Sequence, residues 1–512
     1  MILAVLCLSV FLVVVDNTIV NVALVTFSRD LGASTSQLQW IVDAYSLVFA
    51  GLLLAAGSLG DRRGRKGTMQ VGLLLFAATS VLAALSGSAE QLIAARAAMG
   101  IGAALIFPAT LAILINVFHE PVERAKAIGA WSGVTGLAVA LGPLAGGFLL
   151  EHFWWGSIFL VNLPIVAIAL LAGWKLIPTS RDRHAGRPDP VGIVVSIAMI
   201  SLLVWTVIEA PDNGWTSTVT LAGFAGAAAL LTGFVLWERR RVDPMLDVSV
   251  FSNARFSAAS LAVATAFFGL FGFIFLVTQY FQVVRGYNTL SAGVHTLPFA
   301  VTAAIISPIS ARLALRFGTK LIVGLGLLSM SAGFLAASFL DGGSSYWTAV
   351  VPSMVLMAGG LALTTAPATE AIMGSLPVDK AGVGSAVNDT TREIGGTLGV
   401  AVVGSVFSSL YGPQVAAALT KLGVPAEPVG IARESVVAAM EVAKRAPGFA
   451  RQPILDAASD AFLHGMAAGC RVAGLATLVG AAIAFAALPA RAEAVVGDGA
   501  ALAAAPQPVP AT

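Results

Sequence analysis

The sequence predicts an all-α polytopic membrane protein, and two observations carry that prediction. Hydrophobic residues make up 57% of the chain and charged residues only 11%, whereas soluble domains carry roughly 25% charged residues. The apolar residues also gather into windows of the length that a helix needs to cross the hydrocarbon core of a bilayer, about 20 residues. The composition therefore excludes a set of soluble globular domains.

Fourteen windows have the required length and apolar character. Eleven contain no charged residue, namely 67–89, 97–118, 127–150, 153–174, 190–208, 213–237, 256–284, 286–311, 321–340, 342–369 and 394–420. Three more contain one charge each, namely 1–25 with Asp16, 38–60 with Asp43 and 461–488 with Arg471. Because the first window starts at Met1 with no polar segment before it, we expect the natural start of the chain to lie upstream.

The basic residues predict how these spans are oriented. If the first connection lies outside, 19 of the 29 Lys and Arg residues fall in inward loops and the tail, and only 7 in outward loops. Five of those seven lie in one long outward connection, 412–460, where the positive-inside rule has least force. We therefore expect a multi-pass protein of a bacterial cytoplasmic (inner) membrane with both termini in the cytoplasm.

An internal repeat divides the chain. GSLGDRRGRK (57–66) aligns without gaps on ARLALRFGTK (311–320), with four identities at a constant offset of 254. Each copy follows the second helix of its half, which indicates two six-helix bundles in parallel repeat, a transporter arrangement. The predicted domains are 1–177 (first bundle), 178–255 (an inserted helix pair with its loops), 256–490 (second bundle, including the outward connection 412–460) and 491–512 (a disordered Ala/Pro-rich tail). Within 412–460, the segment ESVVAAMEVAKRA is typical of a helix.

Five motifs resemble the major facilitator superfamily. They are the loop GSLGDRRGRK, RAAMGIGAALIFPA (96–109) in the fourth helix, GLAVALGPLAGG (136–147) in the fifth, and VDNTIVNVAL and QLQWIVDAYSLVFAG in the first two. With fourteen spans, the chain is most similar to the drug/proton antiporter branch, and within it to quaternary-ammonium exporters of the QacA, SmvA and LfrA kind. The resemblance implies the major facilitator fold, two six-helix bundles plus two inserted helices, and export by alternating access.

The chain departs from the pattern of these pumps at three places. The tenth span, LPFAVTAAI (297–305), has no acid, Asn388 precedes Asp389 where a pair of acids can occur, and Ala138 stands where a glycine is common. Fewer titratable groups leave open whether dications are transported and how many protons are exchanged.

Asp16 and Asp43 are the main candidates for proton coupling. A charged Asp at the centre of a membrane helix costs about 2.5–3.5 kcal/mol on insertion scales, so its presence favours a function. Such a carboxylate can bind either a proton or a cationic substrate, which is antiport in its simplest form. The structural alternative for Asp16 is a polar group hydrogen-bonded between helices with the help of Asn17 and Asn21. We expect Asp16 to lie deep in its helix.

Two aromatic residues accompany Asp43. Trp40 lies three positions earlier and therefore on the same helical face, which suits quaternary ammonium ligands through cation–π attraction. Tyr45 is two positions further on and is expected to point to a neighbouring helix. Asp43 itself is expected to lie nearer the outer surface than Asp16.

Four further charged residues lie in or near spans. Asp389 and Glu393 are four residues apart and share a face of the thirteenth span, with Arg392 between them. They form either an internal salt bridge with Arg392 or a second proton site, and the resemblance favours Asp389 for that role. Arg96 begins the fourth-helix motif. Its side chain either reaches to the lipid headgroups or, as the resemblance implies, faces the cavity and modulates an acid.

Two motifs have mechanical roles by resemblance. The loop between the second and third spans is expected to close the inner gate, with Asp61 docking on the other half; its residues are Asp61, Arg62, Gly64, Arg65 and Lys66. The fifth-helix motif is expected to kink that helix and to let helices approach closely, and it marks exporters. Its residues are Gly142, Pro143, Gly146 and Gly147.

These features predict a transporter and not an enzyme. The chain has no Walker loop GxxxxGK[ST] and no zinc-spaced set of Cys and His, so we expect no cofactor, no metal and no ATP, with the proton motive force as the energy source. The leading hypothesis is a proton-coupled antiporter that exports lipophilic, cationic drugs or antiseptics. Its expected partners are such small molecules, protons and membrane lipid, without nucleic acid, and we expect a monomer.

Two alternatives stay open. The same fold could export an endogenous antibiotic, siderophore or lipid. A more remote alternative is a membrane sensor or scaffold that transports nothing, against which the acids within the spans argue, because scaffolding needs no titratable group in the hydrocarbon.

Overall fold

The computed structural model describes residues 1–118, 120–181, 189–241, 244, 246–375 and 381–489. These residues are almost entirely helical, and none of the segments that the structure describes is a strand. The predicted all-α class is therefore confirmed. The predicted disordered tail 491–512 lies outside the described residues.

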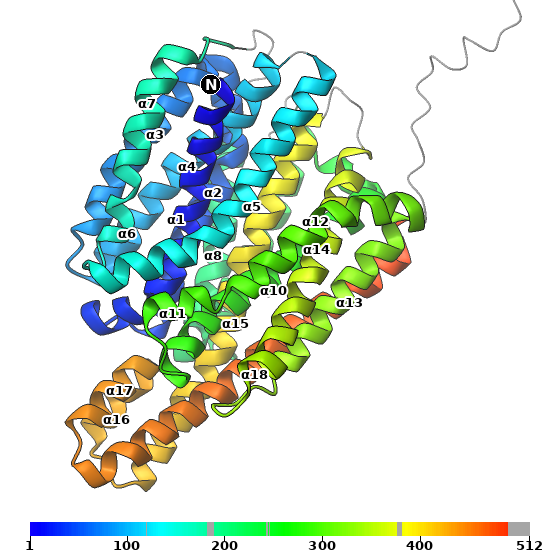
Figure 1. Cartoon of the computed structure of the whole chain (residues 1–512). Helices are drawn as coiled ribbons and strands as arrows, with labels where there is room; N and C mark the ends of the chain where they lie inside the picture. The colour runs from blue at the N-terminus through cyan, green and yellow to red at the C-terminus, as the bar shows by residue number, and fades with distance from the viewer. Residues whose placement is uncertain (119, 182–188, 242–243, 245, 376–380, 490–512) are drawn as a thin grey trace, which may run out of the picture.

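The first bundle consists of seven helices packed against one another (Figure 1). They are α1 (Ile2–Leu31), α2 (Thr35–Arg63), α3 (Arg65–Ala84), α4 (Ala89–Val117), α5 (Pro121–His152), the short α6 (Ser157–Leu160) and α7 (Asn162–Leu176). Polar caps fix two of the starts. At the start of α2, the Ser34 hydroxyl accepts from the backbone N–H of Gln37, and the Gln37 side chain accepts in return from the backbone N–H of Ser34. At the start of α4, the Ser88 hydroxyl accepts from the backbone N–H of Gln91. Such caps satisfy backbone donors that a helix leaves unpaired at its N-terminus.

The inserted pair forms a helical hairpin of α8 (Pro190–Asn213) and α9 (Thr218–Arg240). The helix α8 packs against both α2 and α15 and so contacts both bundles. Ser405 of α15 donates to the Val207 carbonyl at 2.7 Å, and the Trp215 indole donates to Ser409 at 3.0 Å. On the other side, Ser36 of α2 donates to the Glu209 carboxylate at 3.4 Å.

The second bundle contains the remaining helices. They are the 3₁₀-helix η1 (Val248–Ser252), α10 (Ala254–Gln279), the π-helix η2 (Tyr280–Val284), α11 (Thr289–Val294), α12 (Leu297–Phe317), α13 (Thr319–Ala337), the π-helix η3 (Tyr346–Val350), α14 (Val351–Met373), α15 (Ala381–Lys421), α16 (Ala426–Glu434), α17 (Val436–Arg445) and α18 (Gly448–Ala487). The exact boundaries of the predicted domains stay predictions.

All fourteen predicted spans coincide with helices. Among the described residues, thirteen helical segments are long and apolar enough to cross a membrane. The fourteenth is α2, which bends by 52° between its parts Thr35–Leu53 and Ala55–Arg63. The protein is therefore a multi-pass membrane protein.

Two helices are much longer than their predicted spans. The helices α15 and α18 have 41 and 40 residues, which corresponds to roughly 60 Å at 1.5 Å per residue, against a hydrocarbon core of about 30 Å. The predicted connection 412–460 is therefore mostly helical, and the segment expected to be a helix contains α17. We call the end of the molecule with α16 and α17 the hairpin end and the opposite end, with Met1, the N-terminal end (Figure 1).

The internal repeat reappears as a matching backbone turn. Gly64 ends α2 and starts α3 with φ +113°, and Gly318 ends α12 and starts α13 with φ +93°. Each donates its N–H to the carbonyl four residues earlier, at 3.0 Å and 2.8 Å. A positive φ favours glycine over any side chain, so the two copies keep glycine for the same reason.

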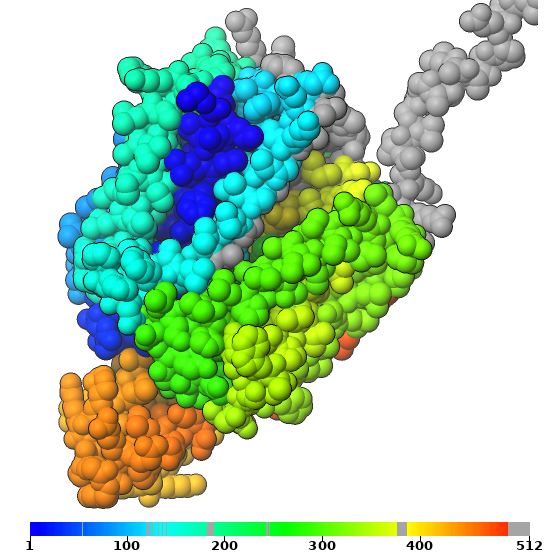
Figure 2. All heavy atoms as spheres, in the orientation of Figure 1, coloured from blue at the N-terminus to red at the C-terminus, as the bar shows by residue number. Residues whose placement is uncertain are grey.

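The bundles are joined at the hairpin end. Gln39 of α2 donates to the Val400 and Ala401 carbonyls of α15, and Gln282 donates to the Val22 carbonyl of α1 at 2.9 Å. The α16–α17 hairpin lies against the same end of the first bundle (Figure 2), where Ser435 and Ser28 share a hydrogen bond of 2.8 Å. All the hydrogen bonds between bundles that we find in the described residues lie toward this end, so the hairpin end is closed.

Candidate functional site

Asp16 is the centre of a polar cluster inside the first bundle. It lies midway along α1 and is fully buried. Arg96 of α4 donates to Asp16 Oδ2 through Nη1 at 2.5 Å, and Asn162 of α7 donates to Oδ1 through Nδ2 at 2.8 Å. Asn162 also donates to Ser80 Oγ of α3 at 3.2 Å. The carboxylate thus ties together four helices, and we call Asp16, Tyr45, Ser80, Arg96 and Asn162 the first-bundle polar cluster.

Arg96 is held entirely within the protein. Its side chain is fully buried, its Nε donates to the Ile41 carbonyl of α2 at 3.2 Å, and its guanidinium carbon lies 4.2 Å from the centre of the Tyr45 ring. The alternative in which Arg96 reaches the lipid headgroups is therefore wrong. Its Nη2 has no hydrogen-bond partner in the part of the chain that the structure describes.

The two asparagines expected to hydrogen-bond to Asp16, Asn17 and Asn21, do not do so in the structure, where Asn162 takes that role. Asn21 donates to the Asn17 and Thr18 carbonyls of its own helix, and Asn17 Oδ1 has no partner among the described residues. The sequence analysis missed Asn162, although it is a polar side chain in the otherwise apolar run IFLVNLPIV. The signal that pointed to Asp16 was therefore present here as well.

Asp43 is as deeply buried as Asp16. Neither of its carboxylate oxygens has a hydrogen bond from the described residues. Trp40 packs against α8, and its indole N–H is 3.4 Å from Glu209 Oε1. Tyr45 points to α1, as expected, and donates to the Val13 carbonyl at 3.2 Å. The role of Trp40 in binding a cation stays a prediction.

The acids of α15 are less deeply buried than those of the first bundle. Asp389 keeps 17% of its side-chain surface exposed, and Glu393 is partly exposed. Arg392 lies 3.9 Å from Asp389 and donates more closely, at 3.0 Å, to Thr369. No hydrogen bond or ion pair to Glu393 is present among the described residues.

The predicted gate loop contacts its own bundle. Arg65 Nε donates to Asp61 at 2.7 Å, its Nη1 lies 3.4 Å from the Ala112 carbonyl, and Lys66 donates to the Trp174 carbonyl at 2.8 Å. Docking of Asp61 on the second bundle is not seen in the described residues. The hydrogen bonds between the bundles that the structure describes lie instead at the hairpin end.

The fifth-helix motif lies where α5 meets two neighbours. Gly142 and Gly146 approach Thr18 and Ile19 of α1, and a methyl group on Gly146 would lie 2.8 Å from Ile19 Cγ1. Gly147 faces α11 of the second bundle, as does the Pro143 carbonyl, which touches Gly293. The motif therefore allows α5 to pack closely against both bundles.

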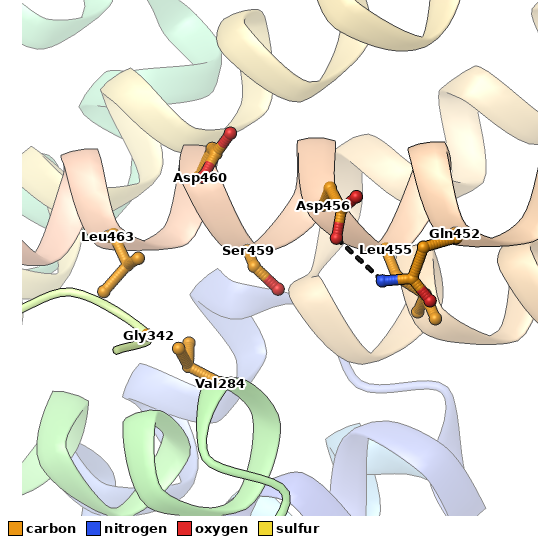
Figure 3. A pocket seen from close by; sticks show the side chains of 8 residues that line it. All are labelled: Val284, Gly342, Gln452, Leu455, Asp456, Ser459, Asp460 and Leu463. Atoms are coloured by element: carbon orange, nitrogen blue, oxygen red, sulfur yellow. Dashed lines mark hydrogen bonds between the residues drawn. The ribbon is translucent and has the colours of Figure 1, made fainter. Parts of the chain in front are cut away.

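A cavity of about 520 Å³ opens on the surface near the hairpin end (Figure 3). The helix α18 contributes Asp456 and Asp460 to its lining, and Ser459 and Leu463 of the same helix point toward Val284 and Gly342. None of the predicted site residues lines this cavity. Among the described residues, no group of three or more His, Cys, Asp or Glu side chains is placed to hold a metal ion.

Comparisons with known proteins agree on the family. A model described as the Major Facilitator Superfamily matches residues 6–400. The multidrug efflux pump LfrA of Mycolicibacterium smegmatis is 37% identical over 94% of both chains. The methyl viologen resistance protein SmvA of Salmonella typhimurium is 36% identical over 88% of this chain and 90% of its own. The tetracenomycin C resistance and export protein of Streptomyces glaucescens is 34% identical over 93% and 89%.

The solved structures support the same fold. A bacterial homologue of the human lysosomal transporter Spinster, in an inward-facing and unoccupied conformation, has a TM-score of 0.64. It shares 17% identity, and the match covers 95% of this chain and 96% of that one.

Proposed function

The chain belongs to the Major Facilitator Superfamily, and on that premise we propose that it is a proton-coupled antiporter that exports lipophilic cations across the cytoplasmic membrane. The three relatives of at least 34% identity described above are, by name, one multidrug efflux pump and two proteins of resistance to single compounds. One of them, SmvA, confers resistance to methyl viologen, a quaternary cation. We assign the N-terminal end to the cytoplasm because the basic loops gather there.

The observation that carries the proposal is the ion pair between Asp16 and Arg96. Removing one partner of a buried ion pair costs about 3–5 kcal/mol, because the other charge is left buried and unpaired. Protonation of Asp16 has the same local consequence, since it removes the charge that holds Arg96. A proton at this site would therefore disturb contacts to α2, α4 and α7 at once. Such a coupling between protonation and helix packing is what an antiporter needs.

We propose that the α15 acids, Asp389 and Glu393, receive the substrate. Asp389 and Glu393 keep part of their surface exposed, while Asp16 and Asp43 are fully buried. A cation arriving from the cytoplasm would meet the α15 acids first. Asp16 would take up its proton when the hairpin end opens. The second bundle would thus bind the cation and the first bundle the proton, one after the other. Exchange of one proton for one monovalent cation moves no net charge, and a second proton would add about 2.3 kcal/mol per 100 mV of membrane potential.

The test is ethidium or benzalkonium export by the purified protein in proteoliposomes with an imposed pH gradient. We expect transport to stop with a protonophore and in Asp16→Asn. The matched control is Asp30→Asn on the same helix, since Asp30 pairs with its neighbour Arg29 at the exposed end of α1. Proton-driven export that survives Asp16→Asn would refute the role of Asp16.

A second candidate is export of a natural antibiotic. The relative from Streptomyces glaucescens exports tetracenomycin C by name. Tetracenomycin C should therefore be included in the same panel. Transport of that compound without transport of any cation would favour the second candidate.

A further inference from the structure

We propose that Asn162 is a positioning residue for Asp16, one that holds the carboxylate in the orientation from which it exchanges its proton. The inference rests on the proposed proton role of Asp16. It assigns to the start of α7 a part in proton coupling that no motif of the sequence analysis gave it.

The geometry around Asn162 is that of a fixed donor. It is the first residue of α7, directly after Val161, the one residue that separates α7 from α6, and only 1% of its surface is exposed. Its Nδ2 is shared between Asp16 Oδ1 at 2.8 Å and Ser80 Oγ at 3.2 Å. Because Ser80 belongs to α3, the amide is anchored on a helix that does not itself touch the carboxylate by a hydrogen bond.

Asn162 and Arg96 divide the carboxylate between them. Arg96 donates to Oδ2 and Asn162 donates to Oδ1. Both groups present N–H donors to the oxygens, and hydrogen bonds of this kind favour the ionised form of a carboxylate. Asn162 therefore fixes the rotation of the carboxylate so that Oδ2 faces Arg96, and it competes with the incoming proton at Oδ1.

Few other groups act on Asp16. Tyr45 of α2 faces the same cluster under the Arg96 guanidinium. The α5 face packed on α1 presents Gly142 and Gly146, which carry no charge. Loss of the Asn162 donor should therefore be felt directly at Asp16.

The principal test is the pH dependence of transport by Asn162→Ala in proteoliposomes. The variant removes a hydrogen bond to the charged Asp16 carboxylate and so makes its ionised form less stable. The pH of half-maximal transport should therefore rise by about one unit, while the maximal rate stays within a few-fold of the original. Ser80→Ala should give a smaller shift in the same direction, because the bond from Asn162 to Asp16 remains. Thr79→Val is the matched control, since Thr79 is the buried neighbour of Ser80 and donates to carbonyls of its own helix.

A second measurement does not depend on transport. In detergent, the carboxylic C=O band of Asp16 is identified by infrared difference spectroscopy from its absence in Asp16→Asn, and it is followed as the pH is changed. The midpoint of this band should move upward in Asn162→Ala and Ser80→Ala and stay fixed in Thr79→Val. If Asn162→Ala does not fold, the Ser80→Ala shift decides the matter.

The outcomes separate the two proposals. A midpoint that is unchanged in both variants, with only a lower rate or yield, would make Asn162 a purely structural residue and overturn the inference. If Asp16→Asn keeps proton-driven transport, the proposed function of Asp16 fails, whereas the infrared midpoint still reports on Asn162.

Discussion

Replacing Gly147 by alanine is expected to open the hairpin end. A methyl group on Gly147 would lie 2.7 Å from both Leu290 Cα and Thr289 O of the second bundle. Both are backbone atoms, so no side-chain rotation relieves the contact. The bundles must separate locally by about 0.7 Å to restore an ordinary contact of 3.4 Å.

The size of the effect follows from the state in which this contact exists. Overpacking at a close contact costs about 1–3 kcal/mol. Gly147 touches the second bundle only while the hairpin end is closed, so the cost applies to that state and not to one in which α5 and α11 have separated. A difference of about 1–3 kcal/mol changes the ratio of the two states roughly 5- to 150-fold.

Distances between spin labels in the detergent-solubilised protein measure that ratio. With the two native cysteines replaced by serine, one pair of labels at Phe153 and Phe339 spans the bundles at the hairpin end, and another at Arg63 and Arg316 spans them at the N-terminal end. All four side chains are exposed. In Gly147→Ala the first pair should move apart and the second pair should approach.

Gly133 provides the matched control on the same helix. A methyl group there would meet no atom within 4 Å, so Gly133→Ala should leave both distance distributions unchanged. If Gly147→Ala gives the same distributions as Gly133→Ala, the contact between α5 and α11 does not hold the hairpin end closed, and the reasoning is refuted.

Two other predictions test the turn and the hairpin. Gly64→Ala should destabilise the protein by about 1–3 kcal/mol, because φ of +113° is strained for any side chain; Gly67→Ala, which meets open space, should not lower the temperature of thermal unfolding. A disulfide between Ser28→Cys and Ser435→Cys, whose hydroxyls are 2.8 Å apart, should tie the hairpin to α1 and stop transport until a reductant is added. Undiminished transport in the oxidised protein would show that the hairpin need not leave α1.

The spans were predictable from sequence because the length of an apolar window depends on the bilayer and not on the rest of the fold. The same holds for Gly64 and Gly318, where the repeat marks a shared backbone turn. The partners of Asp16 were not predictable in this way. Asn17 is adjacent in sequence, but neighbouring residues on a helix point about 100° apart, and the true partner came from α7. Which side chains pair depends on which helices pack together, and the pattern of hydropathy along the sequence does not contain that information.

The environment of Trp40 shows a second limit. Its spacing from Asp43 placed both on one face of α2, which is correct helical geometry. The structure adds α8 to that face, and the indole N–H is directed to Glu209 instead. Where an inserted helix pair docks is a property of the assembled bundles, so the sequence pattern of α2 alone did not reveal it.

The position of α8 has a consequence for the way the molecule moves. When the two bundles rotate relative to each other, a helix that is hydrogen-bonded to both must lose its contacts with one of them. The hydrogen bond between α8 and α15 is 2.7 Å long, and the Trp215 indole, in the turn after α8, adds one of 3.0 Å to α15. Those between α8 and α2 are 3.4 Å. The weaker side is expected to yield, so α8 and α9 travel with the second bundle. We therefore expect the two moving units to be unequal in size. The six spans of the first bundle would move as one rigid unit against a unit of eight spans, which consists of the second bundle with α8 and α9.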